Sequence, residues 1–235
     1  MSQIIFYSGT RNASSWAMRA WLALRAAEVE FEEVIVDIRR PQRFAGLAQV
    51  GQFSPSATVP ALTIDGRAIF DSIAIVEYAN DVAGGALLPA DRLDRAEARS
   101  WIGWQHAGLS RICGRISFES AFYPYKRTLS EAEQDEAARL FAALEPLLGR
   151  SDGPYVFGAV SLADFMLAPT VIRLARHRAD CTAFPRTAAW LAAVIAHPLV
   201  AEWLAEADAA PHIWFDDYLL PGEAPALYAD AVEAR

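Results

Sequence analysis

The sequence predicts a small α/β domain followed by an all-helical domain. The first eighty or so residues run strand, helix, strand, irregular stretch, strand, turn, strand, helix, which is typical of a small sheet covered by helices. Gly84-Gly85 then interrupts the pattern, and from Asp94 onward no segment has convincing strand character. We therefore expect an α/β domain over residues 1–83, a linker over 84–93 and an all-α domain over 94–235.

Each element of the first domain has its own signal. Apolar residues recur every three or four positions from Ser14 to Ala27, as in an amphipathic helix. Asp65-Gly66 separates two short apolar runs, and this pair favours a type I′ hairpin because both turn residues need a positive φ. The predicted strands and helices are Gln3–Tyr7, Ser14–Ala27, Phe31–Asp37, Ala61–Ile64, Arg67–Phe70 and Ser72 to about Val82.

The second half carries two helix-start signals. Ser130 with Glu133, and Ser161 with Asp164, both have the spacing of a capping box, in which a hydroxyl and a carboxylate satisfy the first N–H groups of a helix. The segment from Pro211 to Arg235 contains several aromatic residues, so we expect it to pack back on the body of the protein.

Composition limits the class of function. The net charge of −8 argues against a polyanion such as nucleic acid as the main partner. The N-terminus lacks a secretory signal pattern, and no apolar run approaches the ~20 residues that a membrane span needs, so we expect a soluble cytoplasmic protein. Cys113 and Cys181 lie in segments that both look helical, without a Cys-x-x-Cys pair, and two buried free thiols are the expected state.

Ser14 lies between a predicted strand and a predicted helix. Unpaired N–H groups and the positive end of the helix dipole favour a negative charge there, and the hydroxyl adds a hydrogen-bond donor for a thiolate. Taken alone, Ser14 or Ser15 is explained as well or better by a helix cap. The thiolate hypothesis depends on two other segments of the sequence.

Two further segments complete the pattern. A cis proline in Val59-Pro60 would turn the Val59 backbone outward to pair with an extended peptide, although a trans proline opening an edge strand is the alternative. Asp71-Ser72 opens a helix and can hold an α-amino acid by its carboxylate and amino group, although such a pair is commonly just a cap. Together with Ser14 these segments provide a thiolate site, a backbone rail and an amino-acid clamp, which the tripeptide glutathione requires.

Other side chains are weaker candidates. Trp104 and His106, with Trp101, either line a hydrophobic pocket beside the sulfur or belong to the core. Arg111 and Arg176, like Arg115, either hold an acidic substrate or face solvent. The histidines lack the spacing of a metal site, and we expect no metal.

These motifs resemble those of cytosolic glutathione transferases, most closely the serine-type enzymes of the zeta class. The matching residues are Ser14-Ser15-Trp16, Ser54-Pro55 leading to Val59-Pro60, Asp71-Ser72, and the segment from Ser161 to Pro169. Trp16 departs from the zeta pattern, where a cysteine follows the two serines, and the Ser-Ser-Trp start followed by Arg19 resembles a bacterial branch of the family.

The resemblance implies a thioredoxin-like N-terminal domain, a helical substrate-binding domain and a homodimer. It makes Ser14 the residue that activates the glutathione sulfur, with Ser15 and the Trp16 backbone nearby. Val59, Pro60, Asp71 and Ser72 would hold the peptide, and Gln42 or Arg43 would reach the glycyl carboxylate. Arg176 matches a substrate-region arginine of the zeta class.

Three functions follow from these expectations. The first is attack of the glutathione thiolate on a small hydrophobic or acidic electrophile. The second is isomerisation of an acidic substrate with glutathione recycled, as in maleylacetoacetate isomerases. The third is a noncatalytic binding protein that kept the fold, because fold alone does not establish function.

Overall fold

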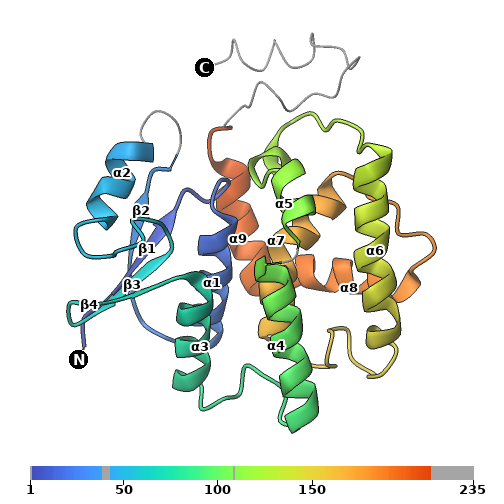
Figure 1. The fold of residues 1–235 in the computed structure, drawn as a ribbon, viewed down its shortest axis with the longest axis horizontal. Helices are drawn as coiled ribbons and strands as arrows, with labels where there is room; N and C mark the ends of the chain where they lie inside the picture. The colour runs from blue at the N-terminus through green and yellow to red at the C-terminus, as the bar shows by residue number, and fades with distance from the viewer. Residues whose placement is uncertain (1, 39–42, 108, 213–235) are drawn as a thin grey trace.

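The computed structural model describes residues 2–38, 43–107 and 109–212, which form two lobes (Figure 1). The N-terminal lobe contains a four-stranded sheet with strand order β2-β1-β3-β4. Its elements are β1 (Ile4–Gly9), α1 (Ser15–Ala26), β2 (Glu32–Val36), α2 (Arg43–Val50), β3 (Ala61–Ile64), β4 (Arg67–Phe70) and α3 (Ser72–Val82).

The connections explain the directions of the strands. β1 and β2 are parallel because α1 carries the chain back between them, while β3 and β4 are antiparallel and joined by a tight hairpin. Asp65 and Gly66 have φ values of 48° and 81°, so the turn uses the two positive-φ positions that the sequence predicted. This hairpin and the helix that follows it keep the predicted bounds.

Helices cover both faces of the sheet. Phe6 and Leu62 point into the large core that contains α1 and α3, whereas Val36, Ala61 and Val50 of α2 form a small separate core on the opposite face. Figure 1 shows the same layering, with α1 and α3 between the sheet and the second lobe and α2 on the far side. The sheet therefore presents α1 to the helical domain.

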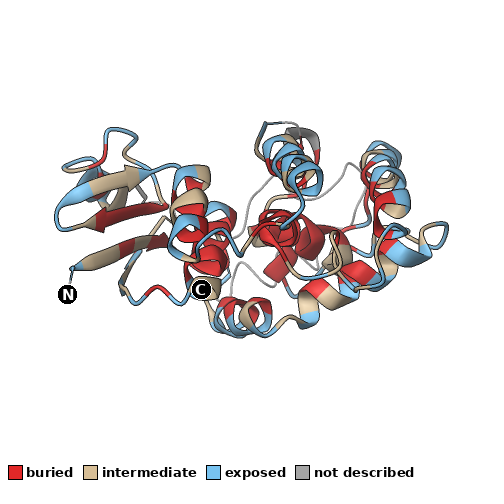
Figure 2. Ribbon diagram, turned by 90° about the horizontal axis from the view of Figure 1, so that it is seen from below, coloured by how far each residue is buried: buried red, intermediate tan, exposed pale blue. Residues whose placement is uncertain are grey.

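The second lobe is helical. Its elements are α4 (Arg92–Ala107), α5 (Ser110–Arg115), the 3₁₀ turn η1 (Glu119–Phe122), α6 (Glu131–Leu148), α7 (Leu162–Arg176), α8 (Pro185–Ala196) and α9 (Pro198–Ala209). Every residue from Leu162 to Leu174 is buried, and α7 is thus surrounded on all sides. Figure 2 shows it as the most continuously buried helix of this lobe.

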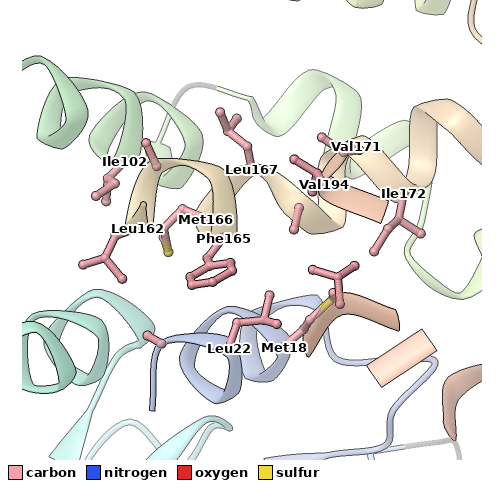
Figure 3. Close-up of a cluster of buried hydrophobic side chains, with 14 of the residues drawn as sticks. Met18, Leu22, Ile102, Leu162, Phe165, Met166, Leu167, Val171, Ile172 and Val194 are labelled. Atoms are coloured by element: carbon pink, nitrogen blue, oxygen red, sulfur yellow. The ribbon is translucent and has the colours of Figure 1, made fainter. Parts of the chain in front are cut away.

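The two lobes meet where α1 packs against α7. Met18 and Leu22 of α1 face Phe165 of α7 across this contact (Figure 3). All three side chains are buried and belong to one continuous core that extends through both lobes. The position of the start of α1 is therefore fixed by packing from both sides.

The structure differs from the sequence-based expectations in three places. The stretch before β3 was expected to be irregular but contains the short helix α2. Gly46 of this helix lies against the Asp37 carbonyl oxygen, which would be 2.8 Å from a Cβ at that position. α4 begins at Arg92, inside the predicted linker, because the Asp91 carboxylate caps it. Cys181 follows α7 outside any helix, and both free cysteines are half-buried, not fully buried.

Most of the aromatic C-terminal segment, residues 213–235, lies outside the described residues. Within the described part, no helix by itself has the length and apolar character to cross a membrane; only α8 and α9 taken together, bent by 69°, meet that test.

Both predicted capping boxes are present. In the second, the buried Asp164 carboxylate accepts hydrogen bonds from the Ser161 N–H at 2.9 Å, the Val156 N–H at 3.1 Å and the Trp190 indole N–H at 2.8 Å. Burial raises the pKa of Asp164 from its ordinary value, and the four hydrogen bonds it receives oppose that rise. One carboxylate thus joins the start of α7 to α8.

We expect Asp164→Ala to lower the free energy of unfolding by about 3 kcal/mol, because it leaves several buried donors without an acceptor. Urea unfolding of the purified protein measures this. Asp91→Ala is the matched control, since it removes an exposed cap from α4 and is expected to cost only about 1 kcal/mol. Equal losses of unfolding free energy in the two variants would show that the buried hydrogen bonds of Asp164 stabilise the protein no more than an exposed helix cap does.

Candidate functional site

Ser14 lies at the junction of β1 and α1. It is the N-cap of α1, its side chain is buried, and its Oγ accepts a hydrogen bond from the Ala17 N–H at 3.2 Å. The alternative interpretation of this serine as a helix cap is thus realised in the structure. Capping uses the oxygen as an acceptor and leaves its hydrogen free to be donated, so capping and thiolate binding are compatible.

The Val59-Pro60 segment lies beside this serine. The Val59-Pro60 peptide bond is cis, as the peptide-rail hypothesis required. A Cβ built on Gly9 would lie 2.5 Å from Ser14 Cβ and 3.0 Å from Val59 Cγ2, so Gly9 is where the helix start and the proline segment come closest. Two segments separated by more than forty residues therefore meet at one point.

Asp71 approaches from a third direction. Its Oδ1 caps α3 by accepting the Ile73 N–H at 2.8 Å, and its Oδ2 lies 3.7 Å from His106 Nε2 of α4. Asp71 has a φ of 73°, a conformation that costs a non-glycine residue about 1–3 kcal/mol and that concentrates at functional sites. Ser72, the next residue, is buried.

Trp16 connects the helix start to the second domain. Its ring contacts His106 edge to face with centroids 5.2 Å apart, and the Arg19 guanidinium lies 4.4 Å above it. His106 contacts both Trp16 and Asp71, so the starts of α1 and α3 and the end of α4 form one continuous cluster. The groups available here to bind a ligand are the first N–H groups of α1, the backbone of Val59 beside Ser14 and the exposed carboxylate of Asp71.

Comparison with known proteins decides the family. The glutathione S-transferase N-terminal domain model matches residues 13–82, and the corresponding C-terminal domain model matches residues 127–206. A maleylacetoacetate isomerase of Mus musculus is 30% identical over 188 residues, covering 77% of this chain and 82% of that protein.

The chain belongs to the glutathione S-transferase family.

Further relatives agree. A probable maleylacetoacetate isomerase of Drosophila melanogaster is 28% identical, covering 77% of this chain and 73% of that protein. Among solved structures, a Burkholderia glutathione transferase homolog with bound glutathione has a TM-score of 0.67 and 26% identity, covering 88% of this chain and 100% of that one. The E7 glutathione S-transferase of Drosophila melanogaster has a TM-score of 0.68 and 27% identity, covering 88% and 93%. The thioredoxin-like domain followed by a helical domain is thus the fold of this family.

The structure separates the remaining candidate residues of this transferase. Trp104 packs edge to face on Trp101, with centroids 5.2 Å apart, and both lie against the core, in accord with the packing alternative. His106 alone of that group reaches the cluster at the start of α1. The side chains of Arg111 and Arg43, and the whole of Gln42, lie outside the described residues.

Arg176 lies elsewhere. Its guanidinium binds the Asp208 carboxylate with both terminal nitrogens, at 2.5 and 2.7 Å, and lies 4.7 Å above the Phe122 ring. It lines a cavity of about 680 Å³ between η1, the connection to α6, and the ends of α7 and α9, and no residue of the N-terminal domain lines that cavity. In this structure Arg176 therefore faces a different space from the Ser14 cluster.

One contact of the site was missed by sequence reasoning. Arg173 of α7 donates a hydrogen bond from Nη2 to Ser15 Oγ at 3.2 Å, across 158 positions of the chain. The signal available in the sequence was Arg173 itself, the one charged residue in the stretch from Phe165 to Leu174, since a charged side chain is rarely buried. Within the described residues, no group of three histidine, cysteine or acidic side chains is placed to hold a metal ion.

We expect Gly9→Ala to displace Ser14 or Val59, because the added methyl group has no room between them. Overpacking of this kind costs about 1–3 kcal/mol of unfolding free energy. Glutathione affinity, measured by calorimetry, should fall together with stability.

Gly103→Ala is the matched control. Gly103 lies inside α4 with nothing within 4 Å of an added Cβ, so the same change should stabilise the protein by about 0.5–1 kcal/mol and leave affinity unchanged. Wild-type affinity in Gly9→Ala would contradict the tight packing described for Ser14.

Proposed function

We infer that this protein is a serine-type glutathione transferase in which Ser14 stabilises the thiolate of glutathione for attack on a small electrophile. The observation that carries this proposal is that Ser14 and Val59 both border Gly9, while Asp71 is linked through His106 to Trp16, two residues after Ser14. Helix capping alone would explain Ser14 and Asp71 one at a time, but it would require neither a cis proline beside Ser14 nor a link from Asp71 to the start of α1.

The energetic demand on the site is modest. Lowering a thiol pKa of ~8.5 by about two units needs roughly 2.7 kcal/mol of preference for the charged form. The hydroxyl of Ser14 offers one charge-assisted hydrogen bond, and the start of α1 adds its unpaired N–H groups and the helix dipole. Together these are of the required size.

The chemistry requires little else from the protein. The thiol proton leaves to solvent, the sulfur lone pair forms a bond to the electrophilic carbon, and the leaving group departs with the electrons of the broken bond; in an addition, those electrons move onto the substrate instead. The protein's part is to keep the sulfur anionic and to hold both reactants in line.

We assign the parts of glutathione to the same segments. The Val59 backbone would pair with the cysteinyl unit beside Pro60, while Asp71 and Ser72 would hold the amino and carboxylate groups of the γ-glutamyl end. Gln42 or Arg43 remains our assignment for the glycyl carboxylate. Trp16 and His106 would form the wall toward the electrophile, which we take to be small and apolar or acidic.

The finer features are also part of this proposal. The Ser-Ser-Trp start favours a zeta-like bacterial branch, and the relatives named above support the zeta kinship. We further propose a cytoplasmic homodimer, as is usual for the family that the motifs resemble.

We expect Ser14→Ala to lower turnover by about ten- to a thousandfold with little change in glutathione affinity, because it removes a donor that acts on developing or fixed charge. Turnover is measured with a panel of electrophiles at saturating glutathione. The change also removes a helix cap worth about 0.5–2 kcal/mol, so Ser14→Thr, which keeps cap and hydroxyl, should retain most activity.

Ser100→Ala is the control for loss of a hydroxyl. Ser100 lies on the exposed side of α4 and bonds only the Ala96 carbonyl, so its loss should leave turnover unchanged. Unchanged turnover in a folded Ser14→Ala variant would remove Ser14 from the mechanism.

The second candidate is a glutathione-dependent isomerase, which the relatives named maleylacetoacetate isomerase favour. In such a reaction glutathione adds to the substrate and is released again, whereas a transferase consumes it. We expect one glutathione to be consumed for each product molecule formed. Titration of the total thiol during turnover measures this. Product formation at constant total thiol would establish the isomerase instead.

A further inference from the structure

Two buried arginines lie behind the start of α1. Arg19 of α1 has no exposed surface, and its guanidinium donates to the Met166 carbonyl at 2.8 Å and to the Ser15 carbonyl at 3.0 Å. Arg173 of α7 is only 4% exposed, and it donates to the Ile116 carbonyl at 2.8 Å besides its bond to Ser15 Oγ. Both guanidinium groups therefore end on the same serine.

The charges of this pair are not neutralised by a direct partner. Within the described residues every oxygen that accepts a hydrogen bond from Arg19 or Arg173 is neutral, and neither arginine forms an ion pair with a carboxylate. By contrast the buried Arg127 forms two bonds with Glu133, at 2.6 and 2.7 Å. An uncompensated pair of buried cations is costly, and it is retained where an anion can offset it.

The two cations repel each other. Burial, followed by the charge of Arg173, lowers the pKa of Arg19 to about 9, and burial also lowers the pKa of Arg173. Among the described residues no oxygen accepts a hydrogen bond from the buried Arg19 Nη2, although the Cys113 thiol interacts with the Arg19 side chain. An anion placed close to the pair would relieve both effects.

Ser15 connects this pair to the thiol site. It is the first residue of α1 and follows Ser14, so its hydroxyl lies at the same helix end. Among the contacts of the described residues, Ser15 Oγ accepts from Arg173 and donates to no atom. Its hydrogen therefore remains available for an acceptor on the side away from Arg173.

We propose that Ser15 is a second donor to the glutathione sulfur, oriented and polarised by Arg173, and that Arg19 and Arg173 supply the positive potential that favours the thiolate. The inference rests on the proposed function, since it places the sulfur at the start of α1. Ser15 would act as a catalytic residue and Arg173 as a positioning residue. The arginine belongs to the helical domain, so the substrate-binding domain takes part in activating glutathione.

Other ionisable groups surround the same region. Cys113 of α5 interacts with Arg19 through a side-chain hydrogen bond and also acts on Arg173, and the charge of Glu119 of η1 acts on Arg173. Asp71 and His106 form a pair beside Trp16. Of these, Cys113 is the competitor for the role of counter-anion. A variant must therefore test it separately.

The experiment measures the pKa of bound glutathione from the ultraviolet absorbance of its thiolate, as a difference between enzyme with and without saturating glutathione. We expect Arg173→Met and Ser15→Ala each to raise this pKa by about one unit, a tenfold loss of thiolate at low pH. In the double variant the two rises should be less than additive, because part of the effect of Arg173 passes through Ser15 and the rest is the direct effect of its charge. Arg173→Lys keeps a cation but not the fork of donors, so we expect a smaller rise.

Two controls keep the measurement specific. Arg25→Met removes an arginine from the exposed end of α1, where it pairs with Glu202 at 2.7 Å, and should leave the pKa unchanged. Cys113→Ala should also leave it unchanged; a large shift would make Cys113 the partner of the arginines and overturn the proposal. If Arg173→Met does not fold, Arg173→Lys and Ser15→Ala carry the test, and a wild-type pKa in both overturns it.

The outcomes separate this inference from the proposed function. A wild-type enzyme that forms no glutathione thiolate would overturn both. A wild-type enzyme whose bound glutathione is ionised, and whose pKa shifts in Ser14→Ala but not in Ser15→Ala or Arg173→Met, would overturn the arginine proposal alone.

Discussion

The packing of α1 between the sheet and α7 is the constraint on which the rest of the structure depends. One side of this helix completes the core of the α/β domain, and Met18 and Leu22 on the other side reach Phe165 in the centre of the helical domain. Because both sides are buried, the first turn of α1 has little freedom to move. The serines at that turn inherit this rigidity, which a site for a single charged sulfur atom requires.

The same packing explains how polar groups can be tolerated in so apolar a contact. Arg19 and Arg173 cross the boundary between the domains, and their N–H groups are satisfied mainly by carbonyl oxygens at helix ends and within helices. Such bonds satisfy donors but do not cancel the charges. The boundary is therefore held by apolar burial, while two positive charges lie within it beside the start of α1.

Local patterns predicted much of the N-terminal domain. The hairpin around Asp65-Gly66 and the helix from Ser72 kept their predicted bounds, because the turn residues and the cap determine them within a few positions. The helix α2 was missed, since its eight residues include Gly46 and their stability comes from packing beside β2. Local signals were insufficient there.

Only part of the candidate site could be predicted from the sequence. Ser14, Val59 and Asp71 could be assembled because each lies at a recognisable helix or strand start. The bond between Arg173 and Ser15 could not, because it depends on how two domains dock, and nothing near either residue specifies the other. Likewise the position of Arg176 in the sequence matches a substrate-region arginine of the zeta class, but in the structure its side chain is held by an ion pair with Asp208 of α9.

The positive φ of Asp71 has a consequence for the evolution of this protein. Glycine would adopt that backbone conformation with less strain, so selection for heat resistance alone would favour losing the aspartate. The cap that its carboxylate gives α3 offsets a few tenths of a kcal/mol of this strain, and a functional requirement for the carboxylate would supply the rest of the pressure to keep it. Libraries sorted for thermal tolerance and libraries sorted for catalysis should therefore diverge at this position sooner than at most others in the chain.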